Sequence, residues 1–505
     1  MKLARVFGNG CVLQRQKPIV VFGEGADGES VRVSLGADNR ISFAETVCEN
    51  GRWMVKLPER EVSSGLTMIV ESDKERIELN DIAVGEVWLG GGQSNMEFLM
   101  KYDADRETAL SGGTQDLVRF YEVPKVSYEG MIDDEDHSDE GIWRKADPEN
   151  IGMFSAVGFY FAMKIREKLG DIPVGMIGCN WGGSSAACWL GEEYLTGELQ
   201  EFADLVHHAD GIDLEKELER FKKDRANQRT PEARARMDAF MSHALTEPMH
   251  FQLSQEMHEA FMRTKYAPFS PFRPNGLYHT MLETVIPYSL RGFLWYQGEE
   301  DCFMPAHYTE LMEAMIRCWR DRWGAELPFI LAQLPVFKNP GGFNSLDYVP
   351  IRRCQEETAK TVPNTYMACI LDKGLPYEIH PKEKKPVGER MALLALSHVY
   401  GEEVLCEVPD VIGAVTKDGV AEIVLKDTKA GLERREDSLD AFKVTVMRKE
   451  ITDFEVTVEG NRIKIGSEKI KPGSRIRIEY GQKDYFTVSL FDSEGIPVRP
   501  FAIEL

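Results

Sequence analysis

The chain has 505 residues, of which 43% are hydrophobic and 28% are charged, and its formal net charge is −23. This composition is typical of a folded protein with two or three domains. The negative balance argues against binding to a nucleic-acid backbone, which requires clustered lysines and arginines.

Cysteine usage and hydropathy indicate the compartment. The nine cysteines form no CxxC pair, so we expect neither a zinc ribbon nor a redox motif. Scattered free cysteines also favour a reducing compartment. The first residues, MKLARVFGNGCVLQRQKP, lack the apolar segment of a secretory signal. No stretch approaches about 18 consecutive apolar residues. We therefore expect a cytoplasmic protein without a membrane partner, and homo-oligomerisation stays open.

The first 80 residues alternate apolar and polar positions between turn residues. Short segments such as KPIVVFGEG, SVRVSL and GRWMVKLP are separated by Gly, Asp and Asn. Residues 1–80 are therefore predicted to form a small antiparallel β-sandwich.

Residues 81–406 have a different pattern. Apolar runs such as VGEVWLGG, PVGMIGCNWGG and LRGFLWYQGE alternate with amphipathic helical stretches. This pattern predicts an α/β domain with a parallel sheet covered on both faces. Residues 192–270 are charged and favour helix, which predicts a helical insertion, with a lid or a solvated spacer as alternatives. Strands return in residues 407–505 and predict a second β domain.

Four predicted strands end in residues that can do chemistry. In open α/β sheets, ligands collect at the carboxyl ends of the strands. The four ends contain Gly90–Asn95; Gly182 and Gly183; Gln297, Glu299 and Asp301; and Asp372, Glu378 and His380. Considered alone, Ser94 is typical of a helix cap and His380 of a structural histidine. Together they supply a hydroxyl nucleophile, an imidazole base and oxyanion donors, which are the parts of acyl transfer to water.

Other readings of GGGQSNM conflict with its residues. A phosphate loop requires Gly-Lys-Ser/Thr, and the dinucleotide-binding pattern G-x-G-x-x-G is absent. The nucleophile elbow G-x-S-x-G requires glycine two places after the serine, where this chain has Met96. A nucleophilic Ser94 must therefore lie in a different kind of turn.

Four blocks of the sequence resemble the signature motifs of a known family. VWLGGGQSNME, WGGSSAACW, GFLWYQGEED and IHPKEKKPVGER are similar to those of the sialate O-acetylesterases, in the SGNH (GDSL-like) hydrolase superfamily. CVLQRQKPIVVFGEGADGESVRVSL and NGRWMVKLP resemble the N-terminal β domain of that family. The resemblance covers nearly the whole chain apart from residues 192–270.

The resemblance implies an SGNH-type α/β/α, flavodoxin-like core and a serine esterase that needs no metal or other cofactor. Ser94 would be the nucleophile and His380 the general base. The N–H of Ser94, with Gly183 or its neighbour Gly182 and with Gln297, would line the oxyanion hole. The implied substrates are small acetylated carbohydrates, first acetylated sialic acids and second acetylated xylo-oligosaccharides or other glycosides.

The chain departs from the family pattern near this expected pocket. Glu378 replaces the usual Asp two residues before the histidine, so the group that orients His380 is Glu378, Asp372 or a main-chain carbonyl. Asp301 stands where the family has Asn, and His279 where Asn is common. Ser184, Ser185 and Ala187 replace Thr, Pro and Glu. These departures motivate an alternative, a non-catalytic carbohydrate-binding relative, beside a lipid or thioester hydrolase of the same superfamily.

Three further residues are predicted to contact the sugar, namely Asn95, Trp181 and Glu299. The competing interpretation of Trp181 is core packing, since a tryptophan at a strand end is often buried. The competing interpretation of Glu299 is that it holds its loop, because it follows Gly298 at a tight strand end.

Overall fold

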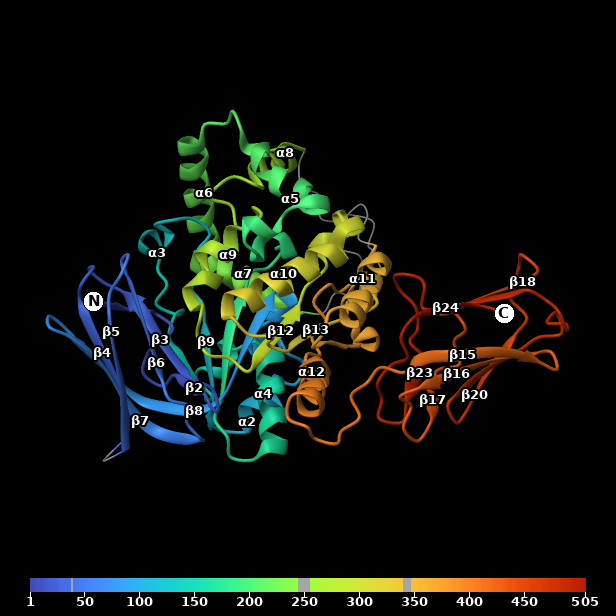
Figure 1. The fold of residues 1–505 in the computed structure, drawn as a ribbon. Helices are drawn as coiled ribbons and strands as arrows, with labels where there is room; N and C mark the ends of the chain where they lie inside the picture. The colour runs from blue at the N-terminus through green and yellow to red at the C-terminus, as the bar shows by residue number, and fades with distance from the viewer. Residues whose placement is uncertain (38–39, 244–254, 339–346) are drawn as a thin grey trace.

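A parallel sheet forms the centre of the computed structural model, which describes residues 1–37, 40–243, 255–338 and 347–505. Its strands run in the order β10-β9-β11-β8-β12-β13-β14. Figure 1 shows this α/β part between the N-terminal strands in blue and the C-terminal strands in red. All neighbouring pairs are parallel except the antiparallel β9–β10 pair. The strands are β8 (Arg76–Gly92), β9 (Gln115–Glu122), β10 (Trp143–Ala146), β11 (Val174–Asn180), β12 (Gly292–Tyr296), β13 (Phe329–Ala332) and β14 (Thr365–Ala368). The prediction of an α/β fold with a parallel sheet is confirmed.

The order of the strands defines where a ligand can bind. Numbered along the chain, the six parallel strands β8, β9, β11, β12, β13 and β14 lie in the order 2-3-1-4-5-6. After β8, the chain forms β9, β10 and β11 on one side of it. The chain then continues to β12 on the other side. Such a reversal opens a crevice at the carboxyl end of the first strand. In this chain that end is Gly92, two residues before Ser94.

Two pairs of helices accompany the sheet. Every residue of β12 and β13 is buried, so both faces of the sheet are covered. The helices α4 (Ala156–Leu169) and α12 (Lys385–His398) pack together, as do α10 (Tyr308–Trp323) and α11 (Tyr348–Thr361). A Cβ at Gly388 would lie 2.5 Å from the Val157 carbonyl oxygen, so this glycine permits the close crossing of α12 and α4. Four shorter helices are α1 (Ser94–Glu97), α2 (Arg106–Ser111), α3 (Met131–Asp134) and α9 (Gly276–Thr280).

The N-terminal strands join the central sheet through β8. One sheet contains β1 (Lys2–Leu3), β3 (Ile19–Glu24) and β6 (Arg52–Leu57), and β8 also pairs with β2 (Val12–Gln14) and β7 (Ser63–Ser72). The strand β4 (Ser30–Ala37) pairs with β7 and with β5 (Arg40–Val47). The alternating burial of β6 agrees with its sequence pattern. One hydrophobic cluster runs from these strands into the α/β part.

The C-terminal strands have a core of their own. Their hydrophobic cluster contains residues from Val408 to Phe501, together with three residues of the α/β part. The strands are β15 (Asp410–Lys417), β16 (Val420–Lys426), β17 (Leu432–Arg434), β18 (Phe442–Val446), β19 (Lys449–Ile451), β20 (Glu455–Glu459), β21 (Arg462–Gly466), β22 (Ile476–Tyr480), β23 (Leu490–Asp492) and β24 (Phe501–Glu504). They form two four-stranded sheets and one two-stranded sheet.

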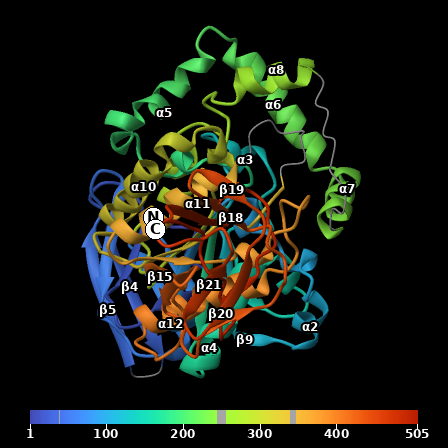
Figure 2. The same ribbon diagram turned by 90° about the vertical axis from the view of Figure 1, so that its right-hand side faces the viewer.

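Helices are observed in the described part of the charged segment predicted as an insertion. They are α5 (Gln200–Asp204), α6 (Leu214–Gln228), α7 (Pro231–Ser242) and α8 (Gln255–Thr264). In Figure 2, α5, α6 and α8 lie at the top of the molecule and α7 lies lower, on the right. Asp213 and Thr230 cap α6 and α7 by accepting main-chain N–H groups three residues on. Among the residues that the structure describes, no helix is both long and apolar enough to cross a membrane.

Candidate active site

The glycines before Ser94 permit close packing at the end of β8. Gly92 has φ of +138°, and a Cβ there would lie 2.2 Å from the carbonyl oxygen of Tyr296 on β12. A Cβ at Gly91 would lie 2.9 Å from the Trp319 ring. The strand therefore reaches the crevice without side chains that would separate it from β12. The short helix α1 then begins at Ser94.

The structure brings Ser94 and His380 together. His380 Nε2 lies 2.8 Å from Ser94 Oγ, although 286 residues separate them in the chain. Burial lowers the pKa of His380 to about 3, and the charges of Lys384 and Lys382 act in the same direction. The imidazole is therefore neutral near pH 7 and is able to accept the hydroxyl proton.

The carboxylates near His380 have different partners. Glu378 Oε1 accepts the main-chain N–H of His380 at 2.9 Å, and Glu378 Oε2 lies 3.3 Å from Lys382 Nζ. Asp372 accepts two hydrogen bonds from Arg390, at 2.6 and 3.0 Å. His380 Nδ1 is buried and has no hydrogen-bond partner among the described residues. Glu378 thus supports the His380 loop through the main chain, and Asp372 is held in an ion pair with Arg390.

Two main-chain N–H groups are available beside the serine. A Cβ at Gly182 would lie 3.4 Å from Ser94 Cβ, so the glycine loop after β11 borders Ser94. Gly182 N–H donates to Glu97 Oε2 at 3.1 Å. Among the described hydrogen bonds, neither Ser94 N–H nor Gly183 N–H donates to a protein acceptor. Both N–H groups thus lack a protein acceptor in the described part of the structure, as an oxyanion donor requires.

Gln297 has a different environment from the predicted one. Its side chain is fully buried, and Nε2 donates to the Ser184 carbonyl at 3.1 Å and to Asp301 Oδ2 at 2.6 Å. Tyr308 donates to Oε1 at 3.0 Å. Neither amide hydrogen is left for a substrate oxygen, so in this structure Gln297 joins two strand-end loops instead of lining the oxyanion hole.

Asp301 holds the same glycine loop. It accepts hydrogen bonds from Ser185 Oγ at 2.5 Å and from the main-chain N–H of Ala186 at 2.9 Å, beside the bond from Gln297. Burial raises the pKa of Asp301, while its hydrogen bonds act against that shift. The departure from the family asparagine therefore has a structural role.

Replacement of Asp301 tests that role. Asp301→Asn keeps an acceptor for Ala186 N–H and Gln297 and removes a buried carboxyl, so we expect a change below about 1 kcal/mol. Asp301→Ala leaves buried donors unpaired and should cost about 1–3 kcal/mol. Urea unfolding of both variants measures the difference, and equal losses would contradict this account.

Asn95, which follows Ser94, and Glu299 are buried, with exposed fractions of 1% and 3%. Asn95 Nδ2 donates to Glu299 Oε1 at 2.5 Å and to the Ile379 carbonyl at 3.0 Å. These contacts are inside the protein, so the structure does not place either side chain against a sugar. It supports the competing interpretation of Glu299 as a residue that holds its loop.

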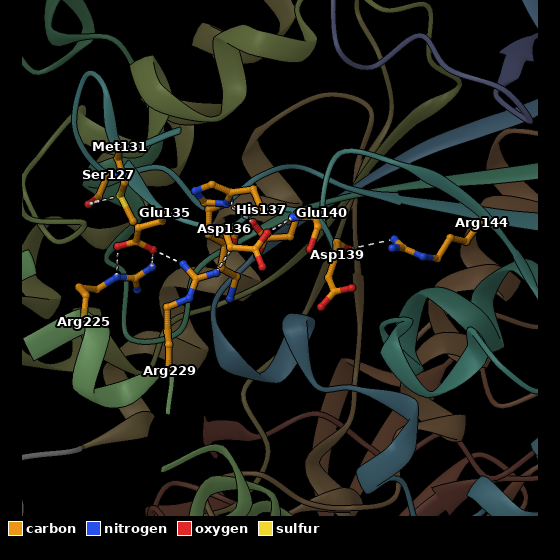
Figure 3. Close-up of polar contacts among 12 residues, drawn as sticks. Ser127, Met131, Glu135, Asp136, His137, Asp139, Glu140, Arg144, Arg225 and Arg229 are labelled. Carbon is orange, nitrogen blue, oxygen red and sulfur yellow. Dashed lines mark hydrogen bonds and ion pairs between the residues drawn. The ribbon is translucent and has the colours of Figure 1, made fainter. Parts of the chain in front are cut away.

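The ring of Trp181 is covered by the helical insertion. The ring is 7% exposed, and Arg225 of α6 lies 5.3 Å from its centroid, with Lys125 Nζ at 5.7 Å. Arg225 also forms a two-point ion pair with Glu135, which Arg229 joins (Figure 3). Trp181 is thus packed under cations and is not an open sugar platform.

The insertion contacts other parts of the site as well. Lys265 at its end pairs with Glu300 at 2.7 Å, and Asp238 of α7 pairs with Lys101 at 2.7 Å. His279, in contrast, is about half exposed and pairs with Glu283. The insertion therefore borders the loops that follow β8, β11 and β12.

Two residues, Glu97 and Lys384, bond to the loops beside Ser94 and were not predicted from the sequence. Glu97 pairs with Lys125 and accepts the Gly182 N–H. Lys384 donates to Asn95 Oδ1 at 2.6 Å. The only signal for Glu97 was its place one turn after Ser94. The position of Lys384 four residues after His380 gave no indication that it is buried.

Comparisons with known proteins agree with this geometry. Residues 264–395 match the family model described as "Carbohydrate esterase, sialic acid-specific acetylesterase". The chain is 25% identical over 436 residues to the sialate O-acetylesterase of Mus musculus, covering 80% of this chain and 74% of that protein. It is 24% identical over 434 residues to the enzyme of Homo sapiens, covering 80% and 72%.

One solved structure has the same architecture over almost its whole length. The crystal structure of a carbohydrate acetylesterase from Xanthomonas citri superposes with a TM-score of 0.75 at 25% identity, covering 99% of each chain. The resemblance predicted from the motifs is confirmed by these findings, and so is the prediction that the chain is an esterase.

Proposed function

We propose that this esterase, which resembles the sialate O-acetylesterases, removes O-acetyl groups from carbohydrates with Ser94 as nucleophile. Acetylated sialic acids are the first substrate class, because the family model and the curated relatives are named for them. The observation that carries the proposal is the 2.8 Å contact between Ser94 Oγ and His380 Nε2 at the reversal point of the sheet. The reversal of strand order at β8 in a parallel sheet supports an SGNH-type, flavodoxin-like core.

The geometry supports a two-step reaction. His380 Nε2 removes the Ser94 hydroxyl proton as Oγ attacks the acetyl carbonyl carbon. The negative charge on the carbonyl oxygen is stabilised by the N–H groups of Ser94 and Gly183. When the C–O bond to the sugar breaks, His380 returns the proton to the departing sugar oxygen. Water, deprotonated by His380, then attacks the acetyl-enzyme and releases acetate.

A second candidate is the deacetylation of xylo-oligosaccharides or other glycosides. It is favoured by the solved relative, which is described as a carbohydrate acetylesterase without a named sugar. The packing of Trp181 under Arg225 and Lys125 favours a small substrate over a polymer laid across the ring. Action on small sugars in the cytoplasm stays a prediction, which subcellular fractionation tests.

A substrate panel tests the proposal. We expect faster hydrolysis of 4-nitrophenyl acetate than of the butyrate and octanoate esters, because a deacetylase prefers the acetyl group. Among natural esters, kcat/KM should be highest for acetylated sialic acids in competition with acetylated xylo-oligosaccharides. Activity that rises with acyl length would favour a lipid or thioester hydrolase. A fluorophosphonate that fails to label Ser94 would favour the non-catalytic alternative.

A further inference from the structure

A buried lysine at the start of α12 reaches the residue next to the nucleophile. Lys384 is 1% exposed, and its Nζ donates to Asn95 Oδ1 at 2.6 Å. Its main-chain N–H donates to Asp103 Oδ2 at 2.9 Å, which fixes the start of the helix. A fully buried lysine is rare in proteins unless it is paired, so its presence beside Ser94 requires an explanation.

Asn95 connects Lys384 to the neighbours of both Ser94 and His380. It directly follows Ser94 in the chain, and its Nδ2 donates to the carbonyl of Ile379, which directly precedes His380. The same Nδ2 donates to Glu299 Oε1 at 2.5 Å. Lys384 holds the Asn95 amide from its oxygen side, and this selects the orientation in which Nδ2 faces Ile379.

Glu299 supplies the opposite charge in this buried group. Burial lowers the pKa of Lys384 to about 7, and the carboxylate of Glu299 counteracts that shift. Burial in turn raises the pKa of Glu299. The ammonium also lies 4.7 Å from the Phe98 ring centroid and 5.5 Å from that of Tyr296, where aromatic faces attract a cation.

We infer that Lys384 is a positioning residue that, through Asn95, sets the loop of His380 against Ser94. The inference rests on the proposed function, because it assigns a role in that reaction. Asn95 directly follows Ser94, and its side chain donates to Ile379, which directly precedes His380. Lys384 bonds to the same side chain. No other described side chain next to Ser94 bonds to a direct neighbour of His380. Misplacement of reacting groups by about 1 Å costs on the order of 100-fold in rate. Loss of the ammonium is therefore expected to appear in kcat.

The charge of Lys384 has a second, separable effect. The charged groups beside His380 are Lys384, Lys382 and Glu378, and both lysines lower the pKa of the imidazole. Removing either lysine should raise that pKa and move the acidic limb of the pH profile upward. Lys382 pairs with Glu378 and makes no described contact with Asn95, so Lys382→Met removes a lysine charge beside His380 and leaves the bonds of Asn95 in place.

The experiment compares Lys384→Met with Lys382→Met, using 4-nitrophenyl acetate and the full chain. Both variants should shift the acidic limb of kcat/KM to higher pH. Only Lys384→Met should lower kcat by about 100-fold with KM little changed. Methionine matches the length of the lysine stem, but it leaves the buried Glu299 without its opposite charge and therefore lowers stability, so kcat is compared below the unfolding temperature of each variant. Thermal unfolding verifies that both variants are folded.

A double-mutant cycle with Asn95→Leu separates positioning from a general weakening of the site. If Lys384 acts through Asn95, adding Lys384→Met to Asn95→Leu should lower kcat little further. Additive losses, or a Lys384→Met variant that is folded and retains wild-type kcat, would overturn the inference and leave the proposed function intact. A wild-type chain without turnover or Ser94 labelling would remove the proposed function and this inference with it.

Discussion

Ser94→Ala is expected to lower kcat/KM for 4-nitrophenyl acetate by a factor of about 10³ or more. Removal of a nucleophile leaves only the catalysis that the oxyanion donors and binding supply. Gly183 N–H and the main-chain N–H at position 94 remain in this variant, so weak residual hydrolysis is expected. Initial rates at substrate concentrations below KM measure the loss.

The control for this variant is its stability. The one side-chain hydrogen bond of Ser94 that the structure describes joins it to His380. The free energy of unfolding of the variant should therefore lie within about 0.5 kcal/mol of the wild-type value. Fluorophosphonate labelling should disappear together with turnover. A folded Ser94→Ala chain that hydrolyses the ester at the wild-type rate would remove Ser94 from the mechanism.

The sequence predicted the Ser94–His380 contact because sheet topology determines it. Residues at the carboxyl ends of parallel strands meet at one edge, whatever their separation in the chain. The glycines at 90–92 indicated a close approach, and the structure shows that a side chain at Gly92 would meet Tyr296. Both features follow from backbone geometry, which the residue pattern encodes.

The direction of individual side chains was not encoded in the same way. Three polar residues lie at the predicted strand ends but bond inside the protein instead of facing a substrate. Asn95 bonds to Glu299, and Gln297 bonds to the loops of Ser184 and Asp301. Gly298 has φ of +148°, and a Cβ there would lie 2.8 Å from Ile351. This turn sets the directions of its neighbours through long-range packing, which a single sequence does not reveal.

The contact of the insertion with Trp181 was also beyond sequence analysis. The charge pattern of residues 192–270 predicted helices, and helices are observed. Which face they cover depends on ion pairs with distant partners, such as Arg225 with Glu135 (Figure 3). A charged helix face is more often solvated than paired, so the charge pattern alone did not indicate that α6 packs on Trp181.

Glu86→Ala is expected to cause the largest loss of stability among the substitutions considered. Glu86 lies in β8 and is fully buried. Its carboxylate accepts hydrogen bonds from Arg291 at 2.7 and 3.0 Å, from Arg15 at 2.5 Å and from Gln14 at 3.1 Å. This cluster joins the N-terminal strands to the segment that enters β12. Removing the carboxylate leaves two arginines largely buried without it, which costs about 3–5 kcal/mol.

A second glutamate on the same strand provides the matched control. Glu78 pairs with Arg76 at 2.9 Å, but both side chains are about half exposed. Glu78→Ala should therefore cost at most about 1 kcal/mol. Urea unfolding of the two variants measures the contrast. Equal losses would show that the buried cluster does not hold the N-terminal strands to the sheet.

The pH dependence of Glu86 provides an independent test. Burial alone would raise its pKa, but hydrogen bonds and charge from Arg291, with Arg15 and Gln14, outweigh burial and lower the pKa. A carboxyl with a lowered folded-state pKa stabilises the fold above its unfolded-state pKa, and this contribution is lost as pH falls through the folded-state value. The wild type should therefore lose more stability on acidification than Glu86→Ala does. The difference between the two free energies of unfolding should narrow below about pH 4, where the unfolded carboxyl is protonated.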